Sequence, residues 1–356
     1  MTKIVYQKIS SIDEMELLSS IEDIIIETKA HDQKSNSIIN WSWQFKNLPS
    51  KSSHIYIAKL NNRIIGYYHI PTFQFMLDKQ IINIGNVQSV AIKKEYRNRG
   101  IFENLSKYAQ SDVIRSVDLL YTFPNDKSIH TFMKYNDYTF LKTLPVYIFP
   151  INLFKILNSK LPNFISKILS NIFINLNSLR SFKINKNEKI KQTNIISNEN
   201  LNLIKHYNSQ FKYHLLRDEK FLKWKYVDSA KSKYYCMSFS KDSKIQASII
   251  FRFDRMFNHN CVVIMDYAYN SLLSMKKLLS NLNETDEIKS KDLSFMMLTG
   301  LSRDLHKISK CGFFKVPKFL IPRKLNLLIK SCSDKIFLKN LNKDDWYISL
   351  SDWDVL

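Results

Sequence analysis

The sequence has 356 residues, of which 45% are apolar, a composition sufficient for the cores of two ordinary domains. It therefore excludes a disordered chain. The net charge is +21, from 53 Lys and Arg against 32 Asp and Glu. Such a charge favours polyanionic partners, among them nucleotide cofactors and anionic lipid, but the chain contains no zinc finger or basic-aromatic recognition motif. We therefore expect no nucleic-acid partner.

Two further features bear on location and on cysteine chemistry. No apolar run reaches the roughly 18 to 20 residues of a membrane span, and the first residues lack the order of a signal peptide. We therefore expect a soluble, cytoplasmic protein. The cysteines lie far apart, with no CxxC pair and no histidine at zinc spacing, which argues against a disulfide framework or a metal site. We interpret them as buried thiols: Cys236, Cys261, Cys311 and Cys332.

Hydrophobic periodicity predicts alternating strands and helices over the first 150 residues. Strands are expected over residues 3–9, 54–60, 63–70, 81–92 and 118–123, with a last strand pair over 138–149, and helices over 12–29, 101–117 and near 128–135. Two local signals support this order. Asn61 and Asn62 tolerate the positive φ angles of a two-residue hairpin turn, and Ser11 with Glu14 forms a capping box before the first helix.

Residues 151–182 contain no acidic residue and place Ile, Leu and Phe at helical spacing on both sides of Pro162. This pattern is typical of a helix on a membrane surface, but helices that join two domains have the same pattern. We favour packing between domains. Because the order of elements after residue 191 echoes the first domain, we divide the chain into a domain over 1–150, a basic helical linker over 151–190 and a second domain over 191–356.

Gly100 is the most informative of only five glycines in the chain. It lies between a strand that ends near Ile92 and a helix that begins near Ile101, where free backbone N–H groups and the helix dipole converge. Such a turn binds anions, and a pyrophosphate fits it. Arg97 and Arg99 add positive charge. On the residues alone, a charged turn that only caps the helix is an equally good interpretation.

Residues 90–105, VAIKKEYRNRGIFENL, resemble the acetyl-CoA-binding motif of GCN5-related N-acetyltransferases, commonly V-x-V-x-P-x-Y-R-x-x-G-x-G/A-x-x-L. The match runs without gaps, with Phe102 where Gly or Ala is usual and Lys94 where Pro is usual. Residues 123–150 resemble the FPN-x-x-S-x-x-x-F-x-x-x-x-G-W segment of a bacterial subset of this family, often two-domain proteins of surface-polysaccharide pathways. The resemblance covers residues 1–150.

The resemblance implies an α/β fold with a mixed, splayed sheet, helices on both faces and acetyl-CoA between the fourth and fifth strands. It implies that the backbone of Val90, Ala91 and Ile92 pairs with the pantetheine arm, and that one of those amides stabilises the oxyanion. It places these residues around the rest of the cofactor: Arg97, Asn98, Arg99, Gly100, Ile101, Phe102, Asn125 and Ser128. The alternative for Asn125 and Ser128 is a turn and a helix N-cap.

The tyrosine that usually protonates the leaving thiolate in this family corresponds to Phe132 here. Tyr135 and Tyr138 lie nearby and His69 is a candidate base, although such residues on half-apolar faces are more often packing residues. The glycine of the family's G-W pair corresponds to Asp137. Two outcomes stay open: catalysis through proximity, a backbone amide and solvent-mediated proton transfer, or binding of acetyl-CoA without turnover. We expect catalysis.

The second half resembles the end of another acetyltransferase domain through Cys311-Gly312-Phe313, but no R-x-x-G-x-G loop precedes it. We therefore expect a degenerate second domain of the same fold, which shapes the acceptor site. Three tryptophans are candidates for stacking on a sugar ring, with core packing as the favoured alternative: Trp224, Trp346 and Trp353.

The implied function is that of an acetyl-CoA-dependent N-acetyltransferase acting on a primary amine, with an amino sugar or sugar nucleotide as the expected acceptor. One alternative is acetylation of protein or peptide amines. Another is a non-catalytic adaptor that binds acyl-CoA or a membrane surface, supported by Phe132 and by the basic linker. The sequence leaves the oligomeric state open.

Overall fold

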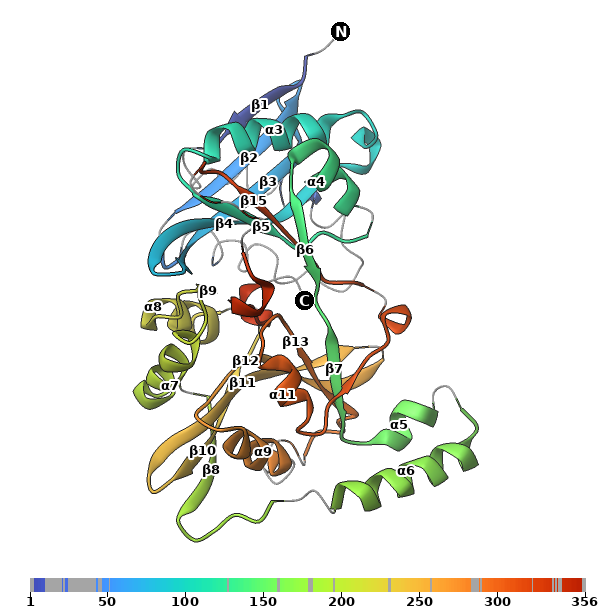
Figure 1. Ribbon diagram of the computed structural model, residues 1–356. Helices are drawn as coiled ribbons and strands as arrows, with labels where there is room; N and C mark the ends of the chain where they lie inside the picture. The colour runs from blue at the N-terminus through green and yellow to red at the C-terminus, as the bar shows by residue number, and fades with distance from the viewer. Residues whose placement is uncertain are drawn as a thin grey trace. The chain divides into compact units, whose positions relative to one another are not determined.

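The structure is a computed structural model, and it describes residues 3–9, 21, 23, 24, 43, 47–50, 52–126, 128–158, 161–178, 182–194, 196–229, 232–256, 258–282, 288, 290–321, 323–334, 336, 338 and 341–353. The chain forms two compact units (Figure 1). The first comprises Met1–Leu144, Lys223–Lys231 and Arg323–Asn342, and the second comprises Pro145–Leu222, Ser232–Pro322 and Lys343–Leu356. Each unit is therefore assembled from segments that are distant in the sequence.

The first unit contains a mixed sheet whose strands follow the order β1-β2-β3-β4-β5-β15-β6. They are β1 (Val5–Lys8), β2 (Ser53–Leu60), β3 (Arg63–Leu77), β4 (Gln80–Ile92), β5 (Leu119–Thr122), β15 (Asn326–Ser331) and β6 (Thr139–Thr143). Pairs from β1 to β4 are antiparallel, β4 and β5 are parallel, and β15 is antiparallel to both neighbours. The expected hairpin is confirmed, because Asn61 and Asn62 adopt φ angles of 49° and 62°.

Helices α3 (Ile101–Val113) and α4 (Ile129–Asn136) cover one face of this sheet (Figure 1). The buried face of α3 comprises Leu105, Ala109 and Val113 at helical spacing, and it packs in the same core cluster as Tyr68. Tyr67, the neighbour of Tyr68 on β3, packs in a separate cluster because side chains alternate along a strand. The helix expected over 12–29, with its capping box, lies mostly outside the described residues.

The second unit contains a sheet in the order β14-β7-β13-β12-β11-β10-β8. Its strands are β14 (Phe314–Lys315), β7 (Val146–Pro150), β13 (Phe295–Thr299), β12 (His259–Tyr269), β11 (Lys244–Met256), β10 (Tyr235–Lys241) and β8 (Glu188–Thr193). A short parallel pair in the same unit consists of β9 (Tyr213–Leu215) and β16 (Trp346–Tyr347).

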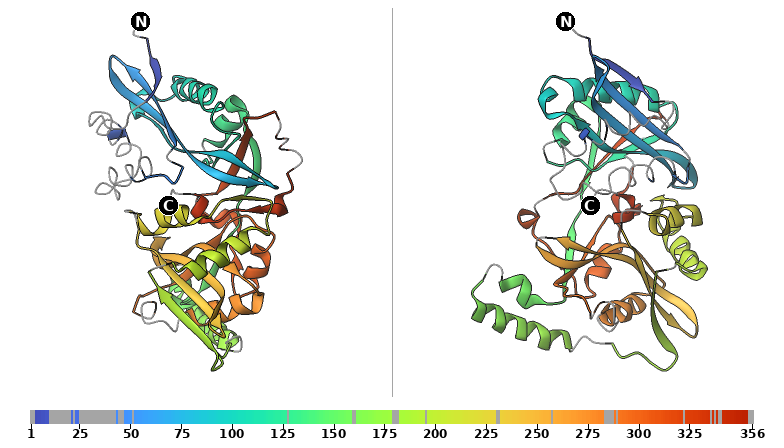
Figure 2. Two further views of the ribbon diagram at one scale, coloured as in Figure 1. Left: turned by 90° about the vertical axis from the view of Figure 1, so that its left-hand side faces the viewer. Right: turned by 180° about the vertical axis from the view of Figure 1, so that it is seen from behind.

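Helices of this unit are α5 (Leu153–Asn158), α6 (Asn163–Ser178), α7 (Asn198–Asn208), α8 (Glu219–Leu222), α9 (Leu272–Ser280) and α11 (Leu305–Ser309). Figure 2 shows that α5 and α6 form a helical pair extending away from the sheet of the second unit. Short helical turns over both units are η2 (Lys94–Tyr96), η3 (Lys223–Val227), η5 (Lys318–Leu320), η7 (Lys343–Asp345) and η8 (Leu350–Asp352).

The two units exchange a strand. β7 follows β6 in the sequence but lies in the second unit, antiparallel to both β13 and β14. β15, from the C-terminal part of the chain, occupies the corresponding place between β5 and β6 in the first unit. The expectation that residues 138–149 form a strand pair is therefore wrong. Local periodicity predicted both strands but not their partners, which lie about 150 to 180 residues away in the sequence.

No helix among the described residues is both long and apolar enough to cross a lipid bilayer. All four cysteines are unpaired thiols. Cys236 and Cys261 are buried, but Cys311 and Cys332 are partly exposed, because they lie near the ends of a helix and a strand. The expectation that all four are buried is corrected to this extent.

Candidate active site

Strands β4 and β5 separate partway along β4. Their parallel pairing ends where Val87 faces Thr122, whose hydroxyl donates to the Val87 carbonyl over 2.9 Å. β4 continues to Ile92 and pairs with β3 on its other side. Among the described strands, none pairs with residues 88–92 on the side of β5. This edge of β4 is therefore available to another extended chain.

A β-bulge lies in β4 at the same point. Tyr67 of β3 faces Ala91 and His69 faces Gln88, so three steps along β4 correspond to two along β3. The additional residue falls at positions 89 and 90 and displaces the backbone from the regular ladder. Backbone N–H groups placed at a gap in this way are suitable donors to a carbonyl oxygen.

The loop between β4 and α3 leaves backbone N–H groups unpaired. Gly100 is the N-cap of α3 with φ 72°, and Asn98 also has a positive φ, of 61°. Within the described part of the chain, no hydrogen bond uses the backbone N–H groups of residues 98–103, and no side chain caps α3. A Cβ atom on Gly100 would meet only Asn104 Nδ2, at 4.0 Å, so the backbone angle and not space requires glycine. The loop has the geometry of an anion site.

The two arginines of the loop have different contacts. Arg97 Nε donates to the carbonyl oxygen of Ile92 over 3.0 Å, which closes the loop against the end of β4. The Arg99 guanidinium lies 5.6 Å from the centre of the Tyr96 ring, a cation–π distance. Both arginines are exposed, so both add positive charge near the N-terminus of α3.

Phe102 points into the core of the first unit. Its ring centre lies 5.6 Å from that of Phe132 and 6.5 Å from that of Tyr68. The bulky side chain that replaces the usual Gly or Ala is thus accommodated beneath α3. Its backbone N–H is among the unpaired groups of the loop.

Two of the candidate catalytic residues are buried. Tyr138 lies beside Phe132, with 5.3 Å between ring centres, and burial raises the pKa of its hydroxyl well above the usual value. His69 Nε2 shares a hydrogen bond of 2.7 Å with the Ser53 hydroxyl, and burial lowers the pKa of the imidazole well below its usual value. At neutral pH the histidine is therefore uncharged and enclosed by protein.

Tyr135 is the third candidate and is 39% exposed at the end of α4. The Lys134 ammonium lies 5.1 Å from the centre of its ring. Phe132, which precedes it on the same helix, instead turns its ring to the core. The structure does not bring Tyr135, Tyr138 and His69 together at one point.

Asn125 and Ser128 form the turn that begins α4. The Ser128 N–H donates to Asn125 Oδ1 over 2.9 Å, and the Ser128 hydroxyl donates to the same oxygen over 3.0 Å. The helix ends at Asp137, which adopts the left-handed conformation with φ 55°. Aspartate tolerates this conformation, which explains how it can stand where the family has glycine.

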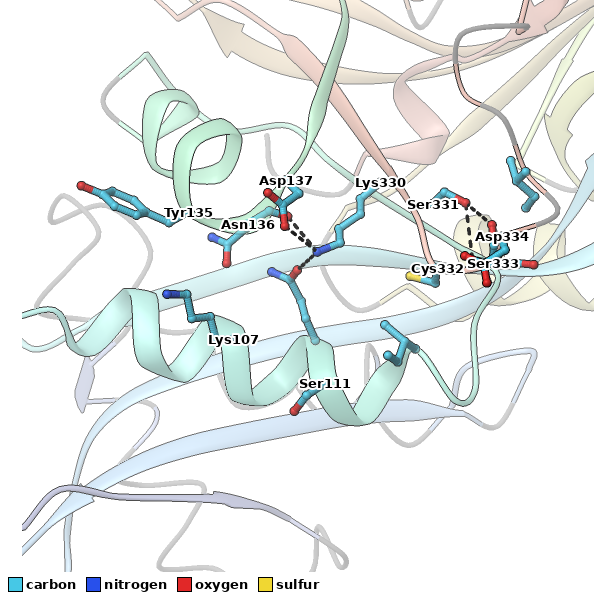
Figure 3. A pocket seen from close by; sticks show the side chains of 13 residues that line it. Lys107, Ser111, Tyr135, Asn136, Asp137, Lys330, Ser331, Cys332, Ser333 and Asp334 are labelled. Atoms are coloured by element: carbon cyan, nitrogen blue, oxygen red, sulfur yellow. Dashed lines mark hydrogen bonds and ion pairs between the residues drawn. The ribbon is translucent and has the colours of Figure 1, made fainter.

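A pocket of about 580 Å³ lies elsewhere in the first unit, between α3, the end of α4 and β15 (Figure 3). Lys330 of β15 donates to Gln110 Oε1 over 2.7 Å and to the Asn136 carbonyl over 2.9 Å. Because a helix C-terminus carries partial negative charge, this lysine ties the exchanged strand to both helices. The pocket is at the opposite end of α3 from Gly100. No sequence pattern indicated it, because Lys330 is remote in the sequence from both helices.

The second unit repeats the strand separation but not the open turn. The parallel pairing of β12 with β13 ends where Val263 faces Met297, although β12 continues to Tyr269. Helix α9 follows directly, and the Ser271 hydroxyl accepts a hydrogen bond of 3.2 Å from the Ser274 N–H. A side chain of the protein therefore occupies the helix terminus that Gly100 leaves open in the first unit.

The C-terminal segment of the chain lies against the separated strands of the second unit. The Tyr347 hydroxyl donates to the Tyr267 carbonyl over 3.0 Å, and Ile348 forms a β-bridge with Leu301. A buried ion-pair network holds this segment in place, because Arg217 donates to Asp266 over 2.6 Å and to Asp352 over 2.9 Å. The network joins Arg217, which follows β9, to Asp266 of β12 and to Asp352 after β16.

The three tryptophans considered for sugar stacking are buried. Trp224 stacks on Trp43 with 4.6 Å between ring centres, and each ring nitrogen donates to the backbone carbonyl of the other residue. Trp346 and Trp353 lie in the second unit and are also buried. Core packing is therefore confirmed as the role of all three.

No family model matches the sequence, and no curated protein matches it either. Solved structures do share the fold, among them the following three. A conserved protein of unknown function from Enterococcus faecalis V583, described as a probable N-acyltransferase, aligns with a TM-score of 0.65 and 13% identity, over 93% of this chain and 73% of that one. A GCN5-related N-acetyltransferase from Anabaena variabilis ATCC 29413 aligns with a TM-score of 0.61 and 11% identity, over 93% and 73%. The N-myristoyltransferase of Saccharomyces cerevisiae with bound myristoyl-CoA aligns with a TM-score of 0.58 and 10% identity, over 92% and 83%.

These likenesses define the class of the fold. The chain has the fold of GCN5-related N-acetyltransferases, with a mixed sheet in each of two units. The α/β architecture expected from the resemblance is confirmed.

Proposed function

We propose that this protein is an acetyl-CoA-dependent N-acetyltransferase that transfers an acetyl group to a primary amine, and that its first unit holds the cofactor. The observation that carries the proposal is the junction of β4 and α3. There, unpaired amides at residues 98–103 follow a strand edge that β5 leaves at Val87. An anion site next to an unpaired strand edge suits the diphosphate and the amide-bearing arm of coenzyme A.

The residues of the first unit fit this cofactor. The amides at Asn98, Arg99, Gly100, Ile101 and Phe102, together with the dipole of α3, suit the diphosphate. The exposed side chains of Arg97 and Arg99 add attraction. In the proposal, the backbone at Val90, Ala91 and Ile92 pairs with the pantetheine arm, and Asn125 and Ser128 at the start of α4 complete the cofactor-binding set.

The bound cofactor supplies an activated acyl thioester. In our proposal the chain holds the acceptor amine beside it and directs backbone N–H groups of the bulge to the carbonyl oxygen. Phe132, at the position of the family's tyrosine, is buried, and so are Tyr138 and His69. We therefore assign proton transfer to solvent and keep the buried Tyr138 and His69 outside the reaction. Tyr135 is exposed, so burial does not exclude it, and a variant tests it directly.

For the acceptor we propose an amino sugar or a sugar nucleotide of a surface-polysaccharide pathway. The support is the charge of the chain, +21, which attracts phosphate-bearing substrates. Because acyl-CoA donors are made inside cells, the proposal also implies a cytoplasmic location.

One rival function is favoured by a specific observation. The burial of Phe132, Tyr138 and His69 is also what a protein that binds acyl-CoA without turnover would show. Release of coenzyme A in the presence of an acceptor amine separates the two, because only the enzyme produces it.

The test compares wild type with Gly100→Glu. The new carboxylate lies at the amides that the diphosphate needs, so we expect acetyl-CoA affinity, measured by calorimetry, to fall at least about 100-fold, or about 2.7 kcal/mol. Coenzyme A release, followed by chromatography with amino-sugar, nucleotide-sugar and peptide amines, falls with it. Chromatography avoids interference from the four free thiols.

Ser271→Glu is the matched control, since it places the same charge at the N-terminus of α9 in the second unit. It should leave acetyl-CoA affinity within about twofold of wild type, because α9 belongs to the second unit and lies outside the proposed cofactor site. Equal affinity in wild type and Gly100→Glu, with both proteins folded by circular dichroism, contradicts the proposed cofactor site. Binding without release for any amine supports the rival.

A further inference from the structure

Over residues 163–172, where the structure describes its side chains, helix α6 presents several apolar side chains to solvent. Phe164, Ile168 and Ile172, spaced four residues apart, are 66%, 56% and 52% exposed. Leu169 is exposed as well. This distribution differs from the expectation that the apolar face of the linker is packed between domains.

The side of α6 that is buried carries serines instead. Ser166 and Ser170 are both buried, and the Ser170 hydroxyl donates to the Ser166 carbonyl over 2.6 Å. With about 100° between successive residues, the exposed apolar residues from Phe164 to Leu169 span an arc of about 140°. The helix is therefore amphipathic, but it exposes its apolar side and buries its small polar side, the opposite of a helix that packs on a globular core. Figure 2 shows that α6 and α5 extend beyond the sheet of their unit.

The segment around α6 is strongly basic. Residues 151–198 contain eight Lys or Arg and one acid, Glu188, which is itself paired with Lys277. Exposed lysines in this segment include Lys167 on α6 and those that follow the helix: Lys183, Lys186, Lys189 and Lys191. An apolar arc with basic neighbours matches the interface of an anionic bilayer, where apolar groups enter the lipid and lysines meet the headgroups.

We propose that α6 docks the protein on the surface of an anionic lipid membrane, with Phe164, Ile168 and Ile172 entering the interface. A second copy of the chain is a poorer occupant, because a two-fold interface on this face brings the basic segments of both copies together. The inference goes beyond the proposed function, since it concerns where the protein acts and is independent of turnover.

The experiment is co-sedimentation of the full chain with vesicles. Wild type should pellet with vesicles of phosphatidylcholine and phosphatidylglycerol, and should remain in solution with phosphatidylcholine alone or at high salt. Ile168→Glu should reduce the partition coefficient at least about tenfold. The variant removes apolar area that the membrane would bury, and its carboxylate is repelled by the anionic headgroups. The matched control is Leu273→Glu, the same change of size class and charge at a residue that is 53% exposed on α9; it should retain binding within about twofold.

Three outcomes overturn the proposal: failure of wild type to bind anionic vesicles, equal binding to neutral vesicles, and equal losses in Ile168→Glu and Leu273→Glu. Light scattering without lipid adds a fourth test. A dimer that Ile168→Glu converts to a monomer, with no vesicle binding by wild type, assigns the face to a second copy. Both variants should bind acetyl-CoA as wild type does, which keeps this test separate from that of the proposed function.

Discussion

The two units contain the same strand separation but differ in the connection from the separated strand to the next helix. In the first unit, residues 93–100 form a loop between β4 and α3, and Gly100 leaves the helix terminus uncapped. In the second unit only residues 270 and 271 join β12 to α9, and Ser271 caps the helix. One terminus leaves its backbone amides unpaired, whereas the other is capped by a protein side chain. The fold therefore separates the two strands in both units, and the loop before the next helix determines whether backbone amides stay unpaired beside that separation.

The units differ in the gap itself as well. On β4 the edge beyond Val87 has no strand partner among the described residues. On β12 the corresponding region is contacted by the C-terminal segment through Tyr347 and held by Arg217. The second unit is thus a closed version of the first, in which the chain's own residues occupy the region that the first unit leaves unpaired.

The largest expected effect is that of breaking the buried network. Arg217→Met removes the cation between Asp266 and Asp352 and leaves two carboxylates buried together. We expect a loss of about 3–5 kcal/mol in the free energy of unfolding, measured by urea denaturation. Acetyl-CoA affinity of the folded variant should stay within about twofold of wild type, because the network belongs to the second unit.

Arg217→Lys is the informative companion, because it keeps the charge but cannot form the same forked contacts with both carboxylates. Its free energy of unfolding should lie between those of wild type and Arg217→Met. A loss below about 1 kcal/mol in Arg217→Met would show that the C-terminal segment is held by its apolar contacts alone.

The second prediction concerns acid stability of the same region. Burial, with the nearby charge of Arg217, lowers the pKa of His214 to about 4, and the imidazole lies against the Phe211 carbonyl. The unfolded chain binds the proton more tightly, so His214 contributes stability above pH 6.5 that is lost as the pH falls toward 4. The contribution is about 3 kcal/mol.

The measurement is urea denaturation of wild type and His214→Gln across this pH range. The difference in unfolding free energy between the two proteins should change by about 3 kcal/mol over this range. A difference that stays constant with pH contradicts the prediction. The difference is the proper readout because Asp352 acts with the opposite sign. Burial raises the pKa of that carboxyl, so its protonation favours the folded state at low pH.

The third prediction compares a glycine near each of the two separations: Gly100 lies between β4 and α3, and Gly300 directly follows β13, the partner of β12. A Cβ atom on Gly300, whose φ is 153°, would lie 2.2 Å from the Ile348 carbonyl oxygen, whereas a Cβ atom on Gly100 has open space. Gly300→Ala should therefore cost about 2–3 kcal/mol of unfolding free energy by displacing the C-terminal segment. Gly100→Ala should cost about 1 kcal/mol, from its backbone angle alone.

These two variants also separate stability from binding. Gly100→Ala should weaken acetyl-CoA binding, because a strained cap shifts the loop amides, while Gly300→Ala should not. Thermal denaturation and calorimetry on the same samples measure both quantities. The reverse pattern, with binding lost in Gly300→Ala, would move the proposed cofactor site out of the first unit.

Local signals predicted the elements of the first unit because their causes are local. Asn61 and Asn62 determine a turn, and Gly100 ends a loop, through backbone angles that each residue permits by itself. The strand exchange has no such signal. β7 and β15 show the pattern of ordinary strands, and period two records which face is buried but not which strand is adjacent.

The candidate site was predictable to the same extent. The open turn involves consecutive residues, 97–102: the position of Gly100 between a strand and a helix suggested an anion site or a plain helix cap, and the family resemblance favoured the anion site. The burial of His69 and Tyr138 and the pairing of Arg217 with Asp352 depend on tertiary contacts, the latter across 135 residues. Arg217 is followed directly by Asp218, Glu219 and Lys220, so nothing in the sequence distinguished it from exposed charges.

The smallest expected effect tests whether the proposed reaction uses a side-chain acid at all. If backbone donors and solvent suffice, Tyr135→Phe should keep kcat for coenzyme A release within about twofold, because the exposed ring at the end of α4 stays in place. Tyr138→Phe should do the same, since its hydroxyl is buried beside Phe132 and the variant keeps the ring contact. A fall in kcat of about 100-fold in either variant, at unchanged KM, would identify that tyrosine as the general acid.

The pH profile of the rate gives a second readout. Without a side-chain acid, the rate should rise as the acceptor amine loses its proton and should then stay level at high pH, because no essential acid is deprotonated there. A falling limb that disappears in one tyrosine variant would assign the acid to that hydroxyl.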